Sequence, residues 1–84
     1  MTRYTVAWVQ SAEDELVEVW LAAENRNAVT SATHVIDQEL GTDAGSKGEE
    51  ISEGLRSLNV PPLRAIFTVS TEDRLVEVVR VTQL

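Results

Sequence analysis

The sequence has 84 residues, a net charge of −7 and no cysteine. A chain of this length is expected to form one domain, residues 1–84, with one sheet, one helical layer and no room for a deep enclosed pocket. The lack of cysteine excludes disulfides and cysteine metal sites. Seven basic residues against fourteen acidic ones argue against an extended surface for phosphate backbones.

The first 24 residues predict a strand followed by a helix. Residues Tyr4–Gln10 are largely apolar on both faces, which is typical of a strand with neighbours or cover on both sides. Ser11 is a candidate N-cap, and the acids that follow it suit the positive end of a helix dipole. An apolar stripe that includes Leu16 and Trp20 then predicts a helix over Ser11–Glu24.

A second helix is predicted over Ala28–Leu40, with Asn27 as its cap. The break before it is so short that the two helices are expected to form an antiparallel αα-hairpin. Residues Gly41–Gly48 contain three glycines and predict a mobile loop. They lack the GxxxxGK[ST] spacing of a phosphate-binding loop, so the loop is interpreted as a connection only.

Three strands are predicted in the rest of the chain. Residues Glu49–Ser57 predict one strand, in which Ile51, Glu53 and Leu55 alternate with Ser52, Gly54 and Arg56, and Gly54 is a candidate bulge. A turn is expected at Asn59–Pro62. Two runs rich in β-branched residues, Leu63–Val69 and Leu75–Val81, flank a polar stretch and predict a β-hairpin.

The predicted element order is therefore β-α-α-β-β-β, which is an α+β fold. The last three strands should form an antiparallel meander, and the first strand should join the same sheet. We expect an antiparallel-rich, four-stranded sheet with the αα-hairpin packed on one face.

This order, together with several short segments, resembles the RelE/ParE superfamily, the toxins of type II toxin–antitoxin modules, also known as plasmid stabilisation proteins. The resemblance covers nearly the whole chain. It rests on the strand with Trp8, the helix end at Trp20 and Leu21, and segments 35–37, 54–58, 62–69 and 73–81. The family implies a compact sheet with an αα-hairpin and a cognate antitoxin that wraps the toxin. RelE-like members cut messenger RNA in the ribosomal A site, whereas ParE-like members poison DNA gyrase.

Three arginines are candidate phosphate or target contacts: Arg56, Arg64 and Arg80. Arg64 resembles the arginine that stabilises charge at the scissile phosphate in RelE-like members, a role that suits a bidentate, permanently charged guanidinium. Arg56 lies where such members carry basic residues. RelE-like RNases usually add a tyrosine or histidine acid–base group after the last strand. Here the only tyrosine is Tyr4 and the only histidine is His34, which favours target binding over RNA cleavage.

The register of the C-terminal hairpin decides whether Arg64 and Arg80 share a face. If Val69 pairs with Leu75, the two arginines lie opposite each other and build a basic patch with Arg56. Like charges directly opposite are destabilising. If Val69 instead pairs with Val76, the slip of one residue moves Arg80 to the other face. The alternative to a patch is that the arginines are solvated or paired with nearby glutamates.

The remaining polar and aromatic residues predict structure rather than a site. His34 is expected on the surface, because one histidine with Asp37 supplies too few ligands for a transition metal. Trp8 and Trp20 are expected in the core. No cofactor and no metal are expected.

The function favoured by these observations is that of a toxin or toxin-like component, nearer to ParE, that binds a protein target such as gyrase and has a cognate antitoxin. One alternative is a RelE-like ribosome-dependent mRNA endoribonuclease. Another is a diverged, non-toxic interaction module, for which a homodimer through an uncovered sheet edge would be evidence. With no signal peptide and no apolar run of about 20 residues, a cytoplasmic protein without a membrane partner is expected.

Overall fold

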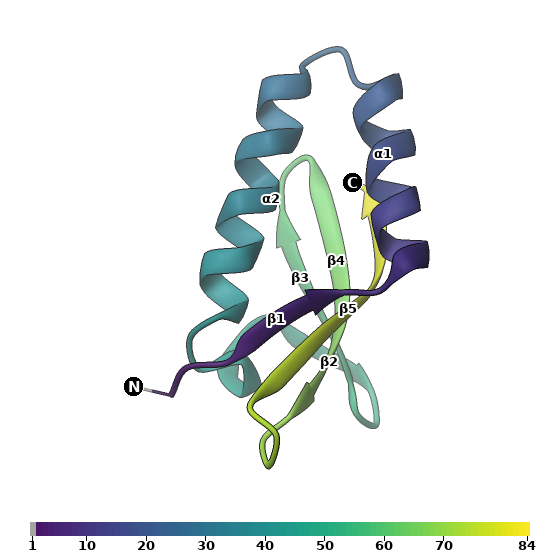
Figure 1. The fold of residues 1–84 in the computed structure, drawn as a ribbon. Helices are drawn as coiled ribbons and strands as arrows, with labels where there is room; N and C mark the ends of the chain where they lie inside the picture. The colour runs from purple at the N-terminus through teal and green to yellow at the C-terminus, as the bar shows by residue number, and fades with distance from the viewer. Residues whose placement is uncertain (1) are drawn as a thin grey trace.

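An αα-hairpin lies on one face of a five-stranded sheet in the computed structural model, which describes residues 2–84 (Figure 1). The elements are β1 (Thr5–Trp8), α1 (Gln10–Ala22), α2 (Arg26–Leu40), the short 3₁₀ helix η1 (Ala44–Ser46), β2 (Glu49–Ser52), β3 (Leu55–Val60), β4 (Leu63–Ser70) and β5 (Leu75–Gln83). The strand order is β1-β5-β4-β3-β2, with β1 parallel to β5 and the other neighbours antiparallel. The predicted α+β class with a one-sided helical layer is confirmed.

The prediction of one strand over Glu49–Ser57, and hence of four strands in all, is wrong. A turn at residues 53–54 separates β2 from β3, and Gly54 there adopts a positive φ of 76°. Glycine reaches this backbone region without steric cost, so Gly54 turns a hairpin and is not the predicted bulge. Strand β3 then runs on to Val60, through half of the segment predicted as a turn.

Both helices begin earlier than predicted, because other residues occupy their caps. The N-cap of α1 is Val9, which makes no side-chain capping bond, and Ser11 already lies inside the helix. The N-cap of α2 is Asn25, not Asn27, and its side-chain oxygen accepts a hydrogen bond of 3.1 Å from the backbone N–H of Ala28. This bond satisfies one of the free N–H groups of the first turn.

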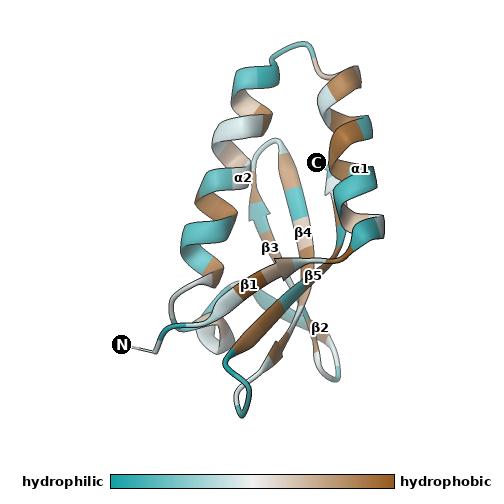
Figure 2. Cartoon of the chain, in the orientation of Figure 1, coloured by the Kyte–Doolittle hydropathy of each residue, from teal (hydrophilic) through white to brown (hydrophobic). Residues whose placement is uncertain are grey.

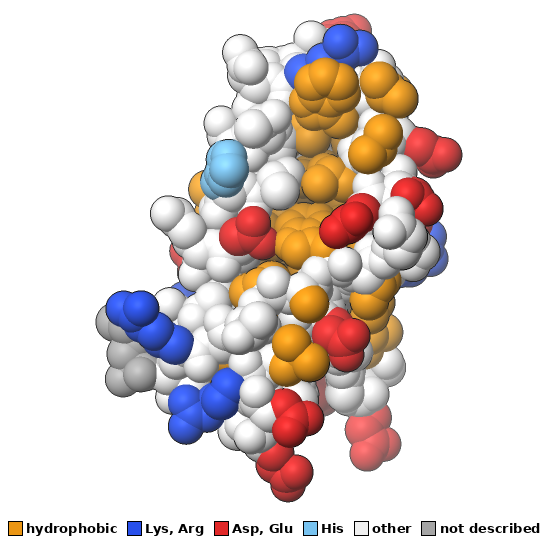
Figure 3. All heavy atoms as spheres, in the orientation of Figure 1, with side chains coloured by type: hydrophobic (Ala, Val, Ile, Leu, Met, Phe, Trp, Pro, Cys, Tyr) orange, Lys and Arg blue, Asp and Glu red, His pale blue; other side chains and the backbone are white. Residues whose placement is uncertain are grey.

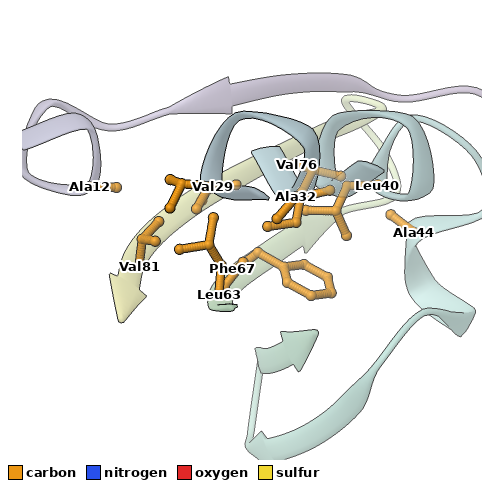
Figure 4. Close-up of a cluster of buried hydrophobic side chains, with 12 residues drawn as sticks. Ala12, Val29, Ala32, Leu40, Ala44, Leu63, Phe67, Val76 and Val81 are labelled. Atoms are coloured by element: carbon orange, nitrogen blue, oxygen red, sulfur yellow. The ribbon is translucent and has the colours of Figure 1, made fainter. Parts of the chain in front are cut away.

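The core lies between the αα-hairpin and the covered face of β4 and β5 (Figure 4). Alternate residues of β4, namely Leu63, Ala65 and Phe67, are fully buried there. Between them Arg64 and Ile66 point to the other, uncovered face and are half-buried. Figure 2 shows hydrophobic stretches on β4 and β5 interrupted by hydrophilic ones. The helices cover the fully buried residues of the hairpin, and the face with Arg64 and Ile66 stays uncovered.

The stretch Gly41–Gly48, predicted as a mobile loop, is fastened to the N-terminal segment over its first half. The backbone N–H of Tyr4 donates to the carbonyl of Gly41 at 2.9 Å. Thr2 and Asp43 exchange two bonds, one of 2.7 Å between backbone groups and one of 2.8 Å to the Asp43 carboxylate. Ala44 is fully buried. These contacts give the stretch a defined path from α2 to β2.

The expectation that Trp20 belongs to the core is wrong, because its side chain is 38% exposed at the end of α1. The guanidinium carbon of Arg26 lies 4.6 Å from the centroid of the Trp20 ring. The same guanidinium donates to the backbone carbonyls of Trp20 and Leu21, both at 3.1 Å. Trp8, by contrast, is half-buried against the core, and its indole N–H donates to Asp37 at 2.8 Å.

Replacing Arg26 with Ala is expected to lower the free energy of unfolding by about 1–2 kcal/mol. The change removes the cation over the Trp20 ring and two donors to carbonyls in the last turn of α1, of which the Trp20 carbonyl also accepts from the backbone N–H of Ala23. Urea unfolding measures the effect. Arg26→Lys keeps the cation but not the forked donors, so it should fall between wild type and Arg26→Ala. An alanine variant as stable as wild type would contradict this role.

Candidate functional site

The uncovered face of the sheet carries two of the three candidate arginines. Arg64 on β4 has Asn59 of β3 and Thr82 of β5 as its cross-strand partners. Arg80 on β5 has Ile66 of β4 as its partner. Cross-strand partners share a face, so Arg64 and Arg80 lie on adjacent strands of the same face, with the pair Ala65 and Val81 between their positions. They do not lie directly opposite each other.

A bulge in β5 creates this arrangement, which neither uniform register predicts. Near the turn Val69 pairs with Val76, as in the second of the two predicted registers. The register then shifts between the partners of Phe67 and Ile66, so that Arg80 follows Val78 as the next paired residue of β5. One extra residue in the strand returns Arg80 to the face of Arg64. The bulge therefore gathers two cations on one face without opposing them.

Arg64 has a donor that no residue in the described part of the chain satisfies. Its Nε is buried, yet it has no hydrogen-bond partner within residues 2–84. Buried donors without a partner are rare in folded proteins, and a guanidinium stays charged at any ordinary pH. The side chain as a whole is half-buried. Arg64 can thus offer a charged N–H to an acceptor on a ligand or a target.

Arg80 is held at the same face by Glu15 of α1. Its guanidinium lies 3.4 Å from one carboxylate oxygen of Glu15, while the other oxygen accepts a bond of 3.1 Å from the backbone N–H of Val81. Strand β1 pairs with β5 only as far as Val78. Beyond that point Glu15, rather than a neighbouring strand, accepts the hydrogen bond from the backbone N–H of Val81. The Arg80 side chain remains 62% exposed and keeps donors for a partner.

Arg56 does not join these two arginines. Its cross-strand partner is Phe67, so it lies on the side of the sheet that the helices cover. Its guanidinium donates to the backbone carbonyls of Lys47 and Gly48, at 2.9 and 3.2 Å. Of the three candidate arginines, only Arg64 and Arg80 share a face, and Arg56 instead binds the segment before β2.

Other groups that could carry chemistry lie away from the two arginines. Tyr4 packs against the core, and His34 is exposed on α2. Glu77 does face the open side, opposite Thr68, and it makes the charge of that face mixed. Within residues 2–84 no three His, Asp or Glu side chains come together as metal ligands, and no helix there is long and apolar enough to cross a membrane.

No sequence pattern indicated the contact that Glu15 makes, because Glu15 is one of the acids that suit the positive end of the first helix dipole. The residue stands 65 positions before Arg80, and no local pattern connects the two. Its contact depends on where β1 stops and α1 crosses the end of β5, which is a property of the folded chain. The acidic residues next to Glu15 in the first turn indicate the N-terminus of a helix and not a contact with β5.

Replacing Glu15 with Ala is expected to lower the free energy of unfolding by about 1–2 kcal/mol, because the N–H of Val81 loses its acceptor in a half-buried position. Glu15→Gln keeps a neutral acceptor and loses only the ion pair with Arg80. Pairs this exposed contribute little, so the Gln variant should stay within about 0.5 kcal/mol of wild type. Urea unfolding compares the two variants. Equal losses of unfolding free energy in both would show that the hydrogen bond from Val81 contributes less to stability than the ion pair with Arg80.

Comparison with known proteins finds likeness in structure only. No family model and no curated protein matches the chain. The toxin–antitoxin complex RelBE2 from Mycobacterium tuberculosis contains a chain with a TM-score of 0.82 and 17% identity, matched over 100% of this chain and 94% of that one. A chain of a chromosomal ParDE system from P. aeruginosa has a TM-score of 0.72 and 17% identity, matched over 100% of this chain and 99% of that one. The isolated E. coli RelE toxin has a TM-score of 0.64 and 12% identity, matched over 95% of this chain and 83% of that one.

These matches run from the first strand to the last and leave no element of the chain unaligned in the first two cases. At such low identity they bear on the backbone arrangement and not on individual side chains. The chain therefore has the fold that RelE and ParE toxins share.

Proposed function

We propose that this chain is a toxin-like component of a type II toxin–antitoxin module that acts by binding a protein target, as ParE-like members do. One observation carries the proposal: Arg64, with a buried and unpartnered N–H, lies beside Arg80 on the uncovered sheet face of a fold seen in toxins. Arginine is enriched among the residues that contribute most to binding in protein interfaces.

The net charge and the side chains on the uncovered face support binding of a protein target over cleavage of RNA. A ribonuclease of the RelE type enters a polyanionic site, and this chain has a net charge of −7. The uncovered face holds the pair of arginines and Glu77, while Tyr4 and His34 lie elsewhere. General acid–base catalysis needs a proton-transferring side chain within reach of the reacting group. The arrangement supplies charge and hydrogen bonds for recognition.

The partner proposed for this toxin-like chain is a small cognate antitoxin. The similar chains from M. tuberculosis and P. aeruginosa belong to a toxin–antitoxin complex and a toxin–antitoxin system. The edge strand β2 is exposed along its whole length, and an open edge can receive a strand from another chain. The target class to test first is DNA gyrase, by resemblance to ParE-like members. A target of that kind places the protein in the cytoplasm.

Induced expression in bacteria that lack an antitoxin tests the proposal. Growth should slow after induction, and purified protein should inhibit gyrase in a supercoiling assay. Normal growth at high soluble expression would overturn the toxin role, and a non-toxic interaction module with this fold would then account for the chain. Growth arrest without gyrase inhibition would keep the toxin role and reject gyrase as the target.

A second candidate, RelE-like cleavage of mRNA on the ribosome, is favoured by one observation. Arg64 and Arg80 share a face, so two guanidinium groups could contact one phosphate backbone. Purified protein added to a translation extract provides the test. Cleavage at A-site codons that Arg64→Ala abolishes would support this function. An absence of cleavage, or cleavage that persists in Arg64→Ala, would rule it out.

A further inference from the structure

One carboxylate of the helical layer reaches the arginine site. The two oxygens of Glu15 have different partners: one accepts a bond of 3.1 Å from the backbone N–H of Val81, and the other lies 3.4 Å from the guanidinium of Arg80. Figure 1 shows α1 passing beside the last part of β5. Glu15 therefore contacts both the backbone of the strand that carries Arg80 and the Arg80 side chain itself.

The bond from Val81 fixes the side of β5 on which the Glu15 carboxylate lies. Strand β5 has β4 on one side and β1 on the other, and the pairing with β1 ends at Val78. Glu15 takes the N–H of Val81 where β1 no longer covers the strand, which is the side away from β4. It thus draws the Arg80 guanidinium toward α1 and away from Arg64, which lies on β4.

Glu77 is the acid that competes with Glu15 for Arg80. Its cross-strand partner Thr68 and the partner of Arg80, Ile66, are two residues apart on β4, so Glu77 and Arg80 occupy neighbouring positions on one face. Glu77 is exposed and forms no ion pair within residues 2–84. The side chain of Glu15 is only 29% exposed and is anchored by Val81. The anchored carboxylate is therefore the one that orders Arg80.

An ordered Arg80 is an advantage for binding. A long side chain loses rotamer freedom when a partner immobilises it, and this loss weakens the complex. The Arg80 side chain is 62% exposed and has one cross-strand neighbour on β4, the apolar Ile66. The contact with Glu15 restricts the guanidinium before a target arrives. It also keeps the two like charges of Arg64 and Arg80 apart.

The charge of Glu15 is not needed for folding. Ion pairs this exposed contribute little to stability, and a neutral amide at the same position would still accept the N–H of Val81. Figure 3 shows further acidic side chains along α1, so the helix does not depend on this one for its charge. Glu15 differs from the other acids of α1 in its contact with Arg80.

We propose that Glu15 is a positioning residue of the arginine site, which holds the Arg80 guanidinium on the α1 side of β5 so that a target meets Arg64 and Arg80 as two separate contacts. This role rests on the proposed function, because that function places the target on the uncovered face. Glu15 acts through Arg80 and does not touch the target itself.

Nuclear magnetic relaxation of the arginine Nε–H groups tests the positioning without reference to growth. The chain has six arginines, and Arg80→Lys identifies the Arg80 signal by its loss. This group should be more ordered in wild type than that of Arg74, which is exposed in a turn. In Glu15→Gln its order should fall to the level of Arg74. Glu18→Gln is the matched control, because Glu18 is exposed on the same helix and the same charge is removed.

Growth after induction tests whether the positioning serves the target. Glu15→Gln should raise the soluble protein level that halves the growth rate by about three- to tenfold, and Glu18→Gln should leave it unchanged. Arg80→Ala and the double variant of Glu15→Gln with Arg80→Ala should be equally weak, because Glu15 acts only through Arg80. Thermal unfolding checks that each variant folds as wild type does.

Three results would overturn the proposal. The first is an Arg80 signal as ordered in Glu15→Gln as in wild type. The second is a Glu15→Gln protein that slows growth as strongly as wild type or more strongly, because Glu15 would then compete with the target for Arg80. The third is an effect of Glu15→Gln that persists beside Arg80→Ala. If wild type itself does not slow growth, the proposed function fails, and the relaxation measurement alone decides whether Glu15 positions Arg80.

Discussion

Replacing Phe67 with Ala is expected to lower the free energy of unfolding by about 3–5 kcal/mol. Phe67 is fully buried and is the largest of the fully buried side chains, so its removal leaves a cavity between the sheet and α2 (Figure 4). A chain of this length has a total stability of about 4–12 kcal/mol. The variant should therefore unfold at a temperature lower by tens of degrees, or fail to fold at ordinary temperature.

Phe67→Leu is the control for this substitution, because leucine refills much of the space and should cost about 1.5 kcal/mol or less. Circular dichroism with urea or heat measures both variants. A loss below about 1 kcal/mol for Phe67→Ala would mean that the site collapses around the cavity. It would also mean that the buried face of β4 contributes less to stability than its complete burial indicates.

Replacing Gly48 with Ala is the second change with a large expected effect. Gly48 adopts a positive φ of 64°, and a Cβ there would lie on the carbonyl oxygen of Ser57 and 2.8 Å from its carbonyl carbon. Both atoms belong to the backbone of β3, which cannot move without opening its pairing with β2. The positive φ costs about 1–2 kcal/mol, and the clash adds about 1–3 kcal/mol.

Gly54→Ala separates the two causes. Gly54 also has a positive φ, 76°, but a Cβ there would meet nothing within 4 Å. It should lower the free energy of unfolding by about 1–2 kcal/mol, the cost of the backbone conformation alone. Urea unfolding of the two variants gives the difference directly. Equal losses at Gly48 and Gly54 would show that the close approach to Ser57 does not contribute.

Element type and order follow from local sequence patterns, and this part of the fold could be predicted. Apolar residues at helical spacing indicate the two helices of the αα-hairpin. Runs of β-branched residues indicate the two strands at Leu63–Val69 and Leu75–Val81. Element boundaries depend on single contacts. Asn25 rather than Asn27 caps α2, because its oxygen reaches the N–H of Ala28. The pattern of residues alone does not distinguish the two asparagines.

The split of the predicted second strand shows a different limit. Ile51 and Leu55 fall in the same phase of a period-2 pattern on either side of Gly54, so the pattern predicts one strand over Glu49–Ser57. A hairpin requires a residue that accepts a positive φ, and Gly54 was the only available signal for it. A glycine inside a strand pattern fits a bulge or a turn equally well.

The candidate site could be predicted only in part, because its geometry depends on a bulge. Arg64 and Arg80 share a face through one extra residue in β5, and no residue there carries a bulge signal such as glycine. Arg56 was grouped with them by charge, whereas its pairing with Phe67 places it on the covered face. Trp20 was assigned to the core by hydrophobicity, and its exposure became visible only with the packing of the hairpin.

We propose that the uncovered sheet face with Arg64 performs the toxin-like function. Growth after induction of wild type, Arg64→Ala and Arg3→Ala, at soluble levels matched by immunoblot, tests this proposal. Arg3 is exposed in the segment before β1 and supplies the same change of charge. We expect slowed growth with wild type and Arg3→Ala, and normal growth with Arg64→Ala. An Arg64→Ala protein that slows growth as strongly as wild type would contradict the claim.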